Sequence, residues 1–204
     1  MTIKRLLIAN RGEIASRIIS SAHDMGISCV AIYTEADKDT PYVREADQAF
    51  KLSDSYLNSK EILDIALKSN SDAIHPGYGF LSENAAFANQ VKKLNIKWVG
   101  PSSNAIKKMG DKLTAKEIAI KANVPTLPMT SDPKKANSIG YPILVKAAAG
   151  GGGKGMRIVE KARDLKESIK AAEREAEGGF GDKRVFLERY IKRSRHIEIQ
   201  ILGD

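Results

Sequence analysis

Residues 3–26 read IKRLLIANRGEIASRIISSAHDMG. The run at 3–9 is short and mostly apolar, which is typical of a buried strand. Beyond it, apolar residues recur with helical spacing at positions 14, 18, 22 and 25, and Gly26 ends the pattern. A strand that leads through a short turn into a helix is the repeating unit of α/β proteins with a parallel sheet.

The same alternation continues as far as residue 99. Further strands are predicted at 29–33, 48–52, 73–75 and 96–99, and helices at 58–68 and from residue 82 onwards. Asn58 and Glu61 form the sequence pattern of a helix N-terminus, and Ser82 is the expected cap of the next helix. This part of the chain is therefore predicted to form a Rossmann-like, doubly wound parallel sheet.

The pattern changes after Gly100-Pro101. Two short helices are predicted at 104–109 and 114–122, with Thr114 and Glu117 in the positions of a capping pair. Prolines at 125, 128 and 133 mark a linker. Strands are then predicted at 141–147, 156–159, 184–191 and 196–202, with a helix at 162–177. The last of these strands alternates apolar and polar residues.

The composition is that of an ordinary globular protein. Of 204 residues, 42% are hydrophobic and 28% are charged, which excludes a disordered or collagen-like chain. The single cysteine, Cys29, excludes a disulfide framework and a cysteine-rich zinc site within the chain. Because the sequence contains neither a run of about 18 apolar residues nor a secretory signal, we expect a cytoplasmic protein with no membrane partner.

The chain is basic, with 33 Lys+Arg against 25 Asp+Glu and a formal net charge of +8. Its lysines are scattered and its aromatic residues do not alternate with basic pairs. A solvated surface with a local anion site is therefore favoured over a nucleic-acid groove. A nicotinamide dinucleotide is also disfavoured. Glu35 or Asp37 would suit a ribose, but the first strand-to-helix turn has Gly12 alone in place of G-x-G-x-x-G.

Residues 146–156 read KAAAGGGGKGM. Glycines at this density allow a left-handed backbone and close approach to a ligand, and their successive N–H groups form an anion-binding concavity. Lys154 is not followed by the Ser or Thr and the helix that a Walker A loop requires. The pattern predicts a strand–loop–strand lid over phosphate, with a flexible hairpin tip as the alternative. The predicted lid residues are Gly150, Gly151, Gly152, Gly153, Lys154 and Gly155.

Other segments also offer groups for a ligand. Lys112 opens a predicted helix and Lys146 ends the strand before the glycine loop, so both are candidates for binding an anion. Residues 188–191 end a strand, where a carboxylate and backbone groups suit an adenine edge. The stretch HPGYGFLSEN at 75–84 follows a strand at the carboxyl edge of the sheet, where open α/β sheets bind ligands. His196 alone is best interpreted as a surface residue.

Taken together, these segments resemble the biotin carboxylase family, the ATP-grasp component of biotin-dependent carboxylases. The resemblance covers nearly the whole chain in the right order. It rests on residues 8–15, 74–84, 109–112, 140–142, 146 with 150–156, and 195–200. It implies a Rossmann-like domain at 1–112. At 113–204 it implies linker helices, an ATP-grasp lid subdomain and the start of a truncated C-terminal portion. The turn signal Gly203-Asp204 directly after a strand also indicates truncation.

The resemblance implies a role for each candidate. Lys112 and Lys146 correspond to lysines that contact ATP phosphates, and the glycine loop corresponds to a lid over them. The adenine-binding segment corresponds to Glu188, Arg189, Tyr190 and Ile191, and the ribose-binding histidine to His196. Tyr78 and Gly79 lie in the loop that approaches the biotin ring. The implied reaction uses ATP, Mg²⁺ and bicarbonate to form a carboxyphosphate-type intermediate, from which the carboxylate passes to biotin.

The family's Mg²⁺ ligands, bicarbonate-binding cations and catalytic arginine are expected downstream of Asp204, so no catalytic residue is assigned in this chain. We expect the 204 residues alone to be inactive. The implied partners are a biotin carboxyl carrier domain and a carboxyltransferase, and the full-length protein is expected to be a homo-oligomer. Another ATP-grasp carboxylate ligase, a non-catalytic nucleotide-binding relative and a basic nucleic-acid binder are the alternative hypotheses.

Overall fold

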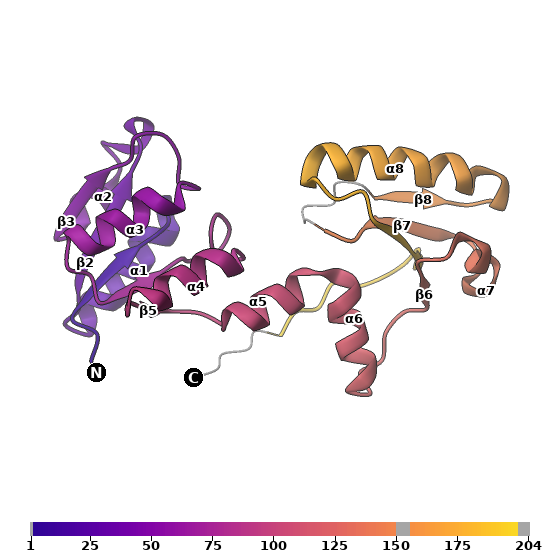
Figure 1. Ribbon diagram of the computed structural model, residues 1–204, viewed down its shortest axis with the longest axis horizontal. Coiled ribbons are helices and arrows are strands. Elements are labelled where there is room, and N and C mark those ends of the chain that lie inside the picture. The colour runs from indigo at the N-terminus through magenta and orange to yellow at the C-terminus, as the bar shows by residue number, and fades with distance from the viewer. Residues whose placement is uncertain (1, 150–155, 200–204) are drawn as a thin grey trace. The chain divides into compact units, whose positions relative to one another are not determined.

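The computed structural model describes residues 2–149 and 156–199, and it divides the chain into two compact units, Met1–Lys107 and Lys108–Asp204 (Figure 1). They are called unit 1 and unit 2 below, and each has its own sheet and its own core. Within the described residues, no helix is both long and apolar enough to cross a lipid bilayer.

A parallel sheet forms the centre of unit 1. Its strands are β1 (Arg5–Ile8), β2 (Ser28–Tyr33), β3 (Gln48–Lys51), β4 (Ala73–His75) and β5 (Lys97–Trp98), in the spatial order β3-β2-β1-β4-β5. In β1, Leu7 lies opposite Val30 of β2 and Ile74 of β4. All four strand pairs are parallel, which confirms the predicted parallel sheet. The segments between the strands are long enough for the crossover connections that parallel pairing needs.

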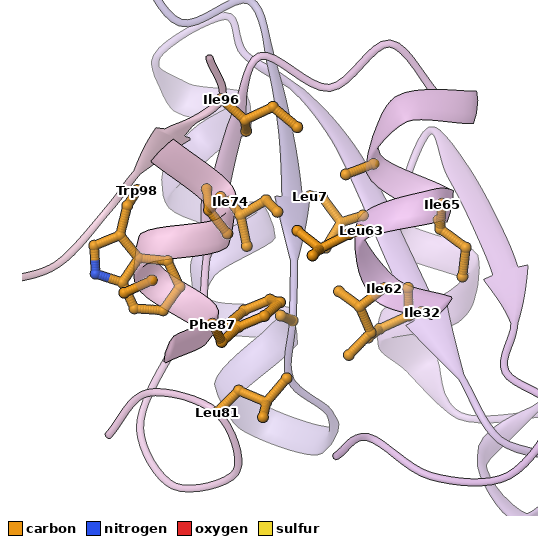
Figure 2. Close-up of a cluster of buried hydrophobic side chains, with 14 of the residues drawn as sticks. Leu7, Ile32, Ile62, Leu63, Ile65, Ile74, Leu81, Phe87, Ile96 and Trp98 are labelled. Carbon is orange, nitrogen blue, oxygen red and sulfur yellow. The ribbon is translucent and has the colours of Figure 1, made fainter. Parts of the chain in front are cut away.

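Helices cover both faces of this sheet. α1 (Gly12–Asp24) and α2 (Pro41–Glu45) pack on the face that carries Leu6 and Ile8. α3 (Ser59–Lys68), α4 (Ala85–Lys93) and α5 (Ser103–Gly110) contribute to the core on the other face, around Leu7 (Figure 2). There the rings of Phe87 and Trp98 meet edge to face with their centroids 5.6 Å apart. The doubly wound arrangement follows from β1, β2 and β4, whose residues are buried on both faces of the sheet.

Of the two helix caps predicted in unit 1, one is confirmed and the other was wrong. Asn58 caps α3, because its side-chain oxygen accepts a hydrogen bond from the Glu61 N–H at 3.2 Å. The next helix is capped by Asn84, which accepts from the Phe87 N–H at 2.9 Å, and the prediction of Ser82 was wrong. The reason is the preceding turn, in which the Asn84 N–H donates to the Leu81 carbonyl, so that the helix begins only after it.

Unit 2 is built on an antiparallel sheet. Its strands are β6 (Met129–Thr130), β7 (Ile143–Ala147), β8 (Arg157–Val159) and β9 (Val185–Arg189), in the spatial order β6-β9-β7-β8. α6 (Lys112–Lys121) precedes the sheet, α7 (Ala136–Ile139) follows β6, and α8 (Leu165–Phe180) lies between β8 and β9 in the chain. The core of unit 2 joins Leu165 and Ala172 from α8 to Ile143 and Val145 from β7.

Several predicted boundaries in unit 2 change. α6 begins at Lys112 and is capped by Asp111, which accepts from the Thr114 N–H at 2.8 Å, so the cap is not Thr114. Within the predicted linker, β6 forms because it pairs with β9. The predicted helix at 162–177 begins with a 3-10 turn, Ala162–Asp164, and α8 continues to Phe180.

The prediction of a strand at 196–202 was wrong for the residues that the structure describes. Residues 196–199 carry no strand, and residues 200–202 lie outside the described part of the chain. Ile197 and Ile199 are 71% and 84% exposed. Their alternation with polar residues is real, but a strand also needs a partner strand and a buried face, and the described residues supply neither here.

Candidate functional site

A cluster of three charged side chains lies on one face of the unit 2 sheet. Residues 143, 145 and 147 of β7 are buried on one face of the strand, and Lys146 lies on the opposite face. β9 is antiparallel to β7, with Phe186 opposite Lys146 and Glu188 opposite Leu144, so the Lys146 and Glu188 side chains share that face. The Lys146 Nζ donates to Glu188 Oε2 at 2.8 Å.

The third member is Lys116 on α6, whose Nζ pairs with Glu188 Oε1. Both carboxylate oxygens of Glu188 are therefore used, one by each lysine. The side chains of Lys116 and Glu188 are each 11% exposed and that of Lys146 is 25% exposed. We call Lys116, Lys146 and Glu188 the lysine–glutamate cluster.

The cluster carries a net positive charge. Burial acts to raise the pKa of Glu188, but hydrogen bonds from Lys116 and Lys146 more than offset this and hold that pKa below its ordinary value. Glu188 is thus ionised at neutral pH, and one carboxylate faces two ammonium groups. A mostly buried excess of one positive charge favours an anionic ligand.

Lys112 is the first residue of α6, and it contacts the residues that directly follow β7, the strand before the glycine loop. Its N–H donates to the Ala148 carbonyl at 3.3 Å, and its Nζ donates to the Ala149 carbonyl at 3.4 Å. The structure thus brings Lys112 to Ala148 and Ala149, which follow shortly after Lys146 in the chain. The predicted lid itself lies outside the described residues, namely Gly150, Gly151, Gly152, Gly153, Lys154 and Gly155.

The Asp111 carboxylate occupies the N-terminus of α6. It accepts from the Thr114 N–H and from the Arg184 guanidinium, with Arg184 Nη2 at 3.0 Å. The hydrogen bond from the Thr114 N–H is the main reason that the pKa of Asp111 lies below its ordinary value. This end of the helix therefore already has an anion of its own chain.

The predicted adenine segment lies partly in β9 and partly beyond it. The N–H groups of Arg189 and Tyr190 donate to the Pro128 and Pro142 carbonyls at 3.0 and 3.1 Å. The Arg189 guanidinium donates to the Ile139 carbonyl at 3.0 Å, so it supports α7. The strand ends at Arg189, two residues earlier than predicted, and Ile191 is 46% exposed.

His196 lies in the exposed segment that follows β9. Its side chain is 86% exposed, and its Nε2 lies 3.9 Å from Glu198 Oε1. Among the described residues, no hydrogen bond or ion pair joins His196 to the lysine–glutamate cluster.

In unit 1 the loop after β4 contains Tyr78 and Gly79. It lies at the carboxyl end of β4, beside β1, as predicted for a ligand-binding edge. The fully buried Asn10 holds it there: its side-chain amide donates to the Pro76 carbonyl at 2.7 Å and to the Tyr78 carbonyl at 2.9 Å. The Tyr78 ring is exposed, and its hydroxyl donates to Glu13 Oε1 at 2.8 Å. This bond raises the pKa of Tyr78.

A glycine is required in this loop. A Cβ at Gly77 would lie 2.6 Å from Asn10 Nδ2 and 2.7 Å from Ile14 Cγ2, and the Gly77 φ is +63°. Its N–H donates to His75 Nδ1 at 2.9 Å. Burial lowers the pKa of His75, which keeps the ring neutral and able to accept this bond.

Asp37 is not a free ribose-binding acid. It is 3% exposed, and it accepts from Arg11 Nε at 2.7 Å and from the Tyr56 hydroxyl at 2.6 Å. The Arg11 hydrogen bonds hold the pKa of Asp37 below its ordinary value. The Arg11–Asp37 ion pair joins the residue before α1 to the turn after β2, so it supports this edge of the sheet.

The sequence prediction missed Lys116 and Asn10. A signal for Lys116 was present, since it lies one helical turn after Lys112 and thus on the same side of α6. Asn10 directly follows the apolar run that ends at Ala9, and a polar residue at the end of a buried strand is a candidate for holding a neighbouring loop.

Family comparison divides the chain in two. Residues 2–106 match the family described as "Biotin carboxylase, N-terminal domain". Residues 111–204 match the family described as "Carbamoyl-phosphate synthase L chain, ATP binding domain".

Curated relatives match over nearly all of the chain. It is 48% identical to "Biotin carboxylase 1" of Bacillus subtilis, covering 99% of this chain and 48% of that protein. It is 47% identical to "Methylcrotonoyl-CoA carboxylase subunit alpha, mitochondrial" of Dictyostelium discoideum, covering 99% of this chain and 31% of that protein. The chain thus spans about half or less of the length of these relatives.

Solved structures agree with the fold. A biotin carboxylase from Campylobacter jejuni, in a complex named β-γ-ATP, matches with a TM-score of 0.90 and 45% identity over 94% of this chain and 46% of that one. The biotin carboxylase domain dimer of the Hydrogenobacter thermophilus 2-oxoglutarate carboxylase, with MgADP, ADP and bicarbonate, matches with a TM-score of 0.90 and 41% identity. It covers 94% of this chain and 45% of that one.

Proposed function

The chain belongs to the biotin carboxylase family, and we propose that it is the N-terminal part of an ATP-dependent ligase that transfers carboxylate from bicarbonate to biotin. The observation that carries the nucleotide part of this proposal is the net positive lysine–glutamate cluster, with Lys112 beside the last described residues before the glycine loop. Several ammonium groups around one point suit the phosphates of ATP.

The proposed role of Lys112 and Lys146 is to bind these phosphates, and that of the glycine loop is to cover them. Residues 188–191 are proposed to hold the adenine through backbone groups other than the Arg189 and Tyr190 N–H, which have partners within the chain. His196 is proposed for the ribose. Tyr78 and Gly79 are proposed to approach the biotin ring.

Mg²⁺ prefers oxygen ligands. The cluster does not fit it, since its one carboxylate has both oxygens in ion pairs with lysines. We therefore place no metal ligand among Lys116, Lys146 and Glu188, and propose that the metal is held elsewhere in the full-length protein.

We further propose that the full-length protein works with a biotin carboxyl carrier domain and a carboxyltransferase, as a homo-oligomer in the cytoplasm. This chain alone is proposed to be inactive. The test is ATP hydrolysis by the 204 residues with and without bicarbonate and free biotin. No dependence on either is expected, and a rate that rises with both would contradict the proposed inactivity.

Nucleotide binding is tested directly by calorimetric titration of ATP into the chain and into Lys146→Ala. Loss of one charge-assisted hydrogen bond to phosphate costs about 1.5–3 kcal/mol, so the dissociation constant should rise about 10- to 150-fold. Lys166→Ala is the matched control, since Lys166 is an exposed lysine on α8. Equal affinities for all three proteins would rule out Lys146 as a phosphate ligand.

A further inference from the structure

Lys116 occupies an unusual position for a lysine. Its side chain is only 11% exposed, and it reaches from α6 to the Glu188 carboxylate on β9. A surface ion pair contributes little to stability, whereas a mostly buried lysine such as Lys116 costs several kcal/mol in desolvation unless it is paired. Lys116 is therefore stable in this position because it is paired with Glu188.

The two lysines around Glu188 are not equivalent. Lys146 lies on the strand that leads to the glycine loop, and its side chain is 25% exposed, whereas that of Lys116 is 11% exposed. Lys146 also lies within 5.9 Å of the Phe186 ring, beside Glu188 in β9. Of the two ammonium groups, Lys146 is thus the one with access to a ligand, and Lys116 is the one that stays with the carboxylate.

A ligand phosphate would create an electrostatic conflict here. If Lys146 left Glu188 for a phosphate oxygen, an unpaired carboxylate would remain mostly buried beside a polyanion. An uncompensated buried charge costs several kcal/mol, and repulsion from the phosphate adds to that cost. A second lysine on the same carboxylate removes both penalties.

We propose that Lys116 is a positioning residue for nucleoside triphosphate, which holds and neutralises the Glu188 carboxylate so that Lys146 is free to bind phosphate. This inference rests on the proposed function of the site. It assigns to Lys116 an action through Glu188 and no contact with the nucleotide.

The experiment compares ATP with adenosine, which has the same base and ribose and no phosphate. Calorimetric titrations of both are made with the 204-residue chain and with Lys116→Met, Lys116→Arg, Glu188→Gln and the Lys116→Met/Glu188→Gln double variant. Circular dichroism melting of each variant checks that it is folded. Lys116→Met should raise the dissociation constant for ATP about tenfold or more and leave that for adenosine within about twofold. Lys116→Arg keeps the charge and should restore most of the ATP affinity.

The double variant shows whether Lys116 acts through Glu188. Glutamine carries no charge to neutralise, so in the Glu188→Gln background the Lys116→Met substitution should change ATP affinity by no more than about twofold. The same tenfold loss in that background would mean that Lys116 binds the nucleotide directly, which overturns the positioning role.

The remaining outcomes separate this inference from the proposed function. Unchanged ATP affinity in Lys116→Met, with loss in Lys146→Ala, would overturn the inference and leave the proposed function in place. Equal losses for ATP and adenosine, with a lower melting temperature, would make Lys116 a purely structural link between α6 and β9. If the unsubstituted chain binds neither ATP nor adenosine, nucleotide binding by this chain is refuted and the inference fails with it.

Discussion

Replacing Asn10 by alanine should destabilise unit 1 and release the loop that carries Tyr78. The substitution removes two bonds donated by the side-chain amide, to the Pro76 and Tyr78 carbonyls, and one that its oxygen accepts from the Arg11 N–H at 2.9 Å. Asn10 is fully buried and Pro76 is buried, so water does not readily replace the first of these bonds.

The loss of stability depends on how exposed each group is that loses its hydrogen bond to Asn10. An unsatisfied buried carbonyl such as that of Pro76 costs about 2 kcal/mol. Tyr78 and Arg11 are near solvent, so their lost bonds cost about 0.5 kcal/mol each. The sum is about 3 kcal/mol. With a urea dependence of about 1.5 kcal/mol per M for a domain of this size, the midpoint should fall by about 2 M.

The assay is urea unfolding followed by tryptophan fluorescence. Trp98 is the only tryptophan in the sequence, and it is 8% exposed in the core of unit 1, so its signal reports that unit alone. Asn104→Ala is the control, since this exposed residue on α5 should change stability by no more than about 0.5 kcal/mol. Faster amide exchange at 77–82 should accompany the loss.

A midpoint for Asn10→Ala equal to that of Asn104→Ala would refute the reasoning. It would mean that the loop is held by its own turn and not by the asparagine.

Two further predictions concern the same edge of the sheet. Gly77→Ala should cost about 2–4 kcal/mol, because a Cβ there meets Asn10 and Ile14 at a φ of +63°. Gly26→Ala is the control, because Gly26 has a φ of +70° but no atom within 4 Å of an added Cβ, and it should cost only about 1 kcal/mol in the same Trp98 assay. Equal losses of stability in the two variants would show that the contacts of the added Cβ at Gly77 do not matter. Asp37→Asn should cost about 1–2 kcal/mol at pH 7. Because the folded pKa of Asp37 is depressed, its contribution is present above the unfolded pKa of about 4 and is lost as the pH falls through the folded value. The difference between the chain and Asp37→Asn should therefore narrow below about pH 4 in urea titrations at several pH values, and a constant difference would contradict the ionised role of Asp37.

Apolar periodicity located most elements because burial and secondary structure share one cause. β4 occupies the predicted residues, Ala73–His75, since a short apolar run between turn residues has no other stable place than a buried strand. Caps were less predictable. Asp111 and Thr114 both offer side-chain oxygens at the start of α6, and the path of the preceding chain decides which one is used.

Long-range pairing accounts for most of what the sequence could not predict. β6 is only two residues long, and Met129 is in a strand because it lies opposite Glu188 of β9. The contact between Lys146 and Glu188 likewise depends on the register of β7 against β9, although each residue was a separate candidate. The contact of Lys116 with Glu188 was not predicted, since it depends on how α6 packs against the face of the sheet that carries Glu188.

The order β3-β2-β1-β4-β5 also affects how the chain emerges during its synthesis. β1 is made first, and β2 covers one of its edges after a short delay. Its other edge waits for β4, which begins at Ala73. A nascent chain that has released β3 but not β4 therefore exposes the open backbone of its central strand, a template for pairing with another chain. This interval of translation is therefore the one in which the central strand of unit 1 still has an unpaired edge.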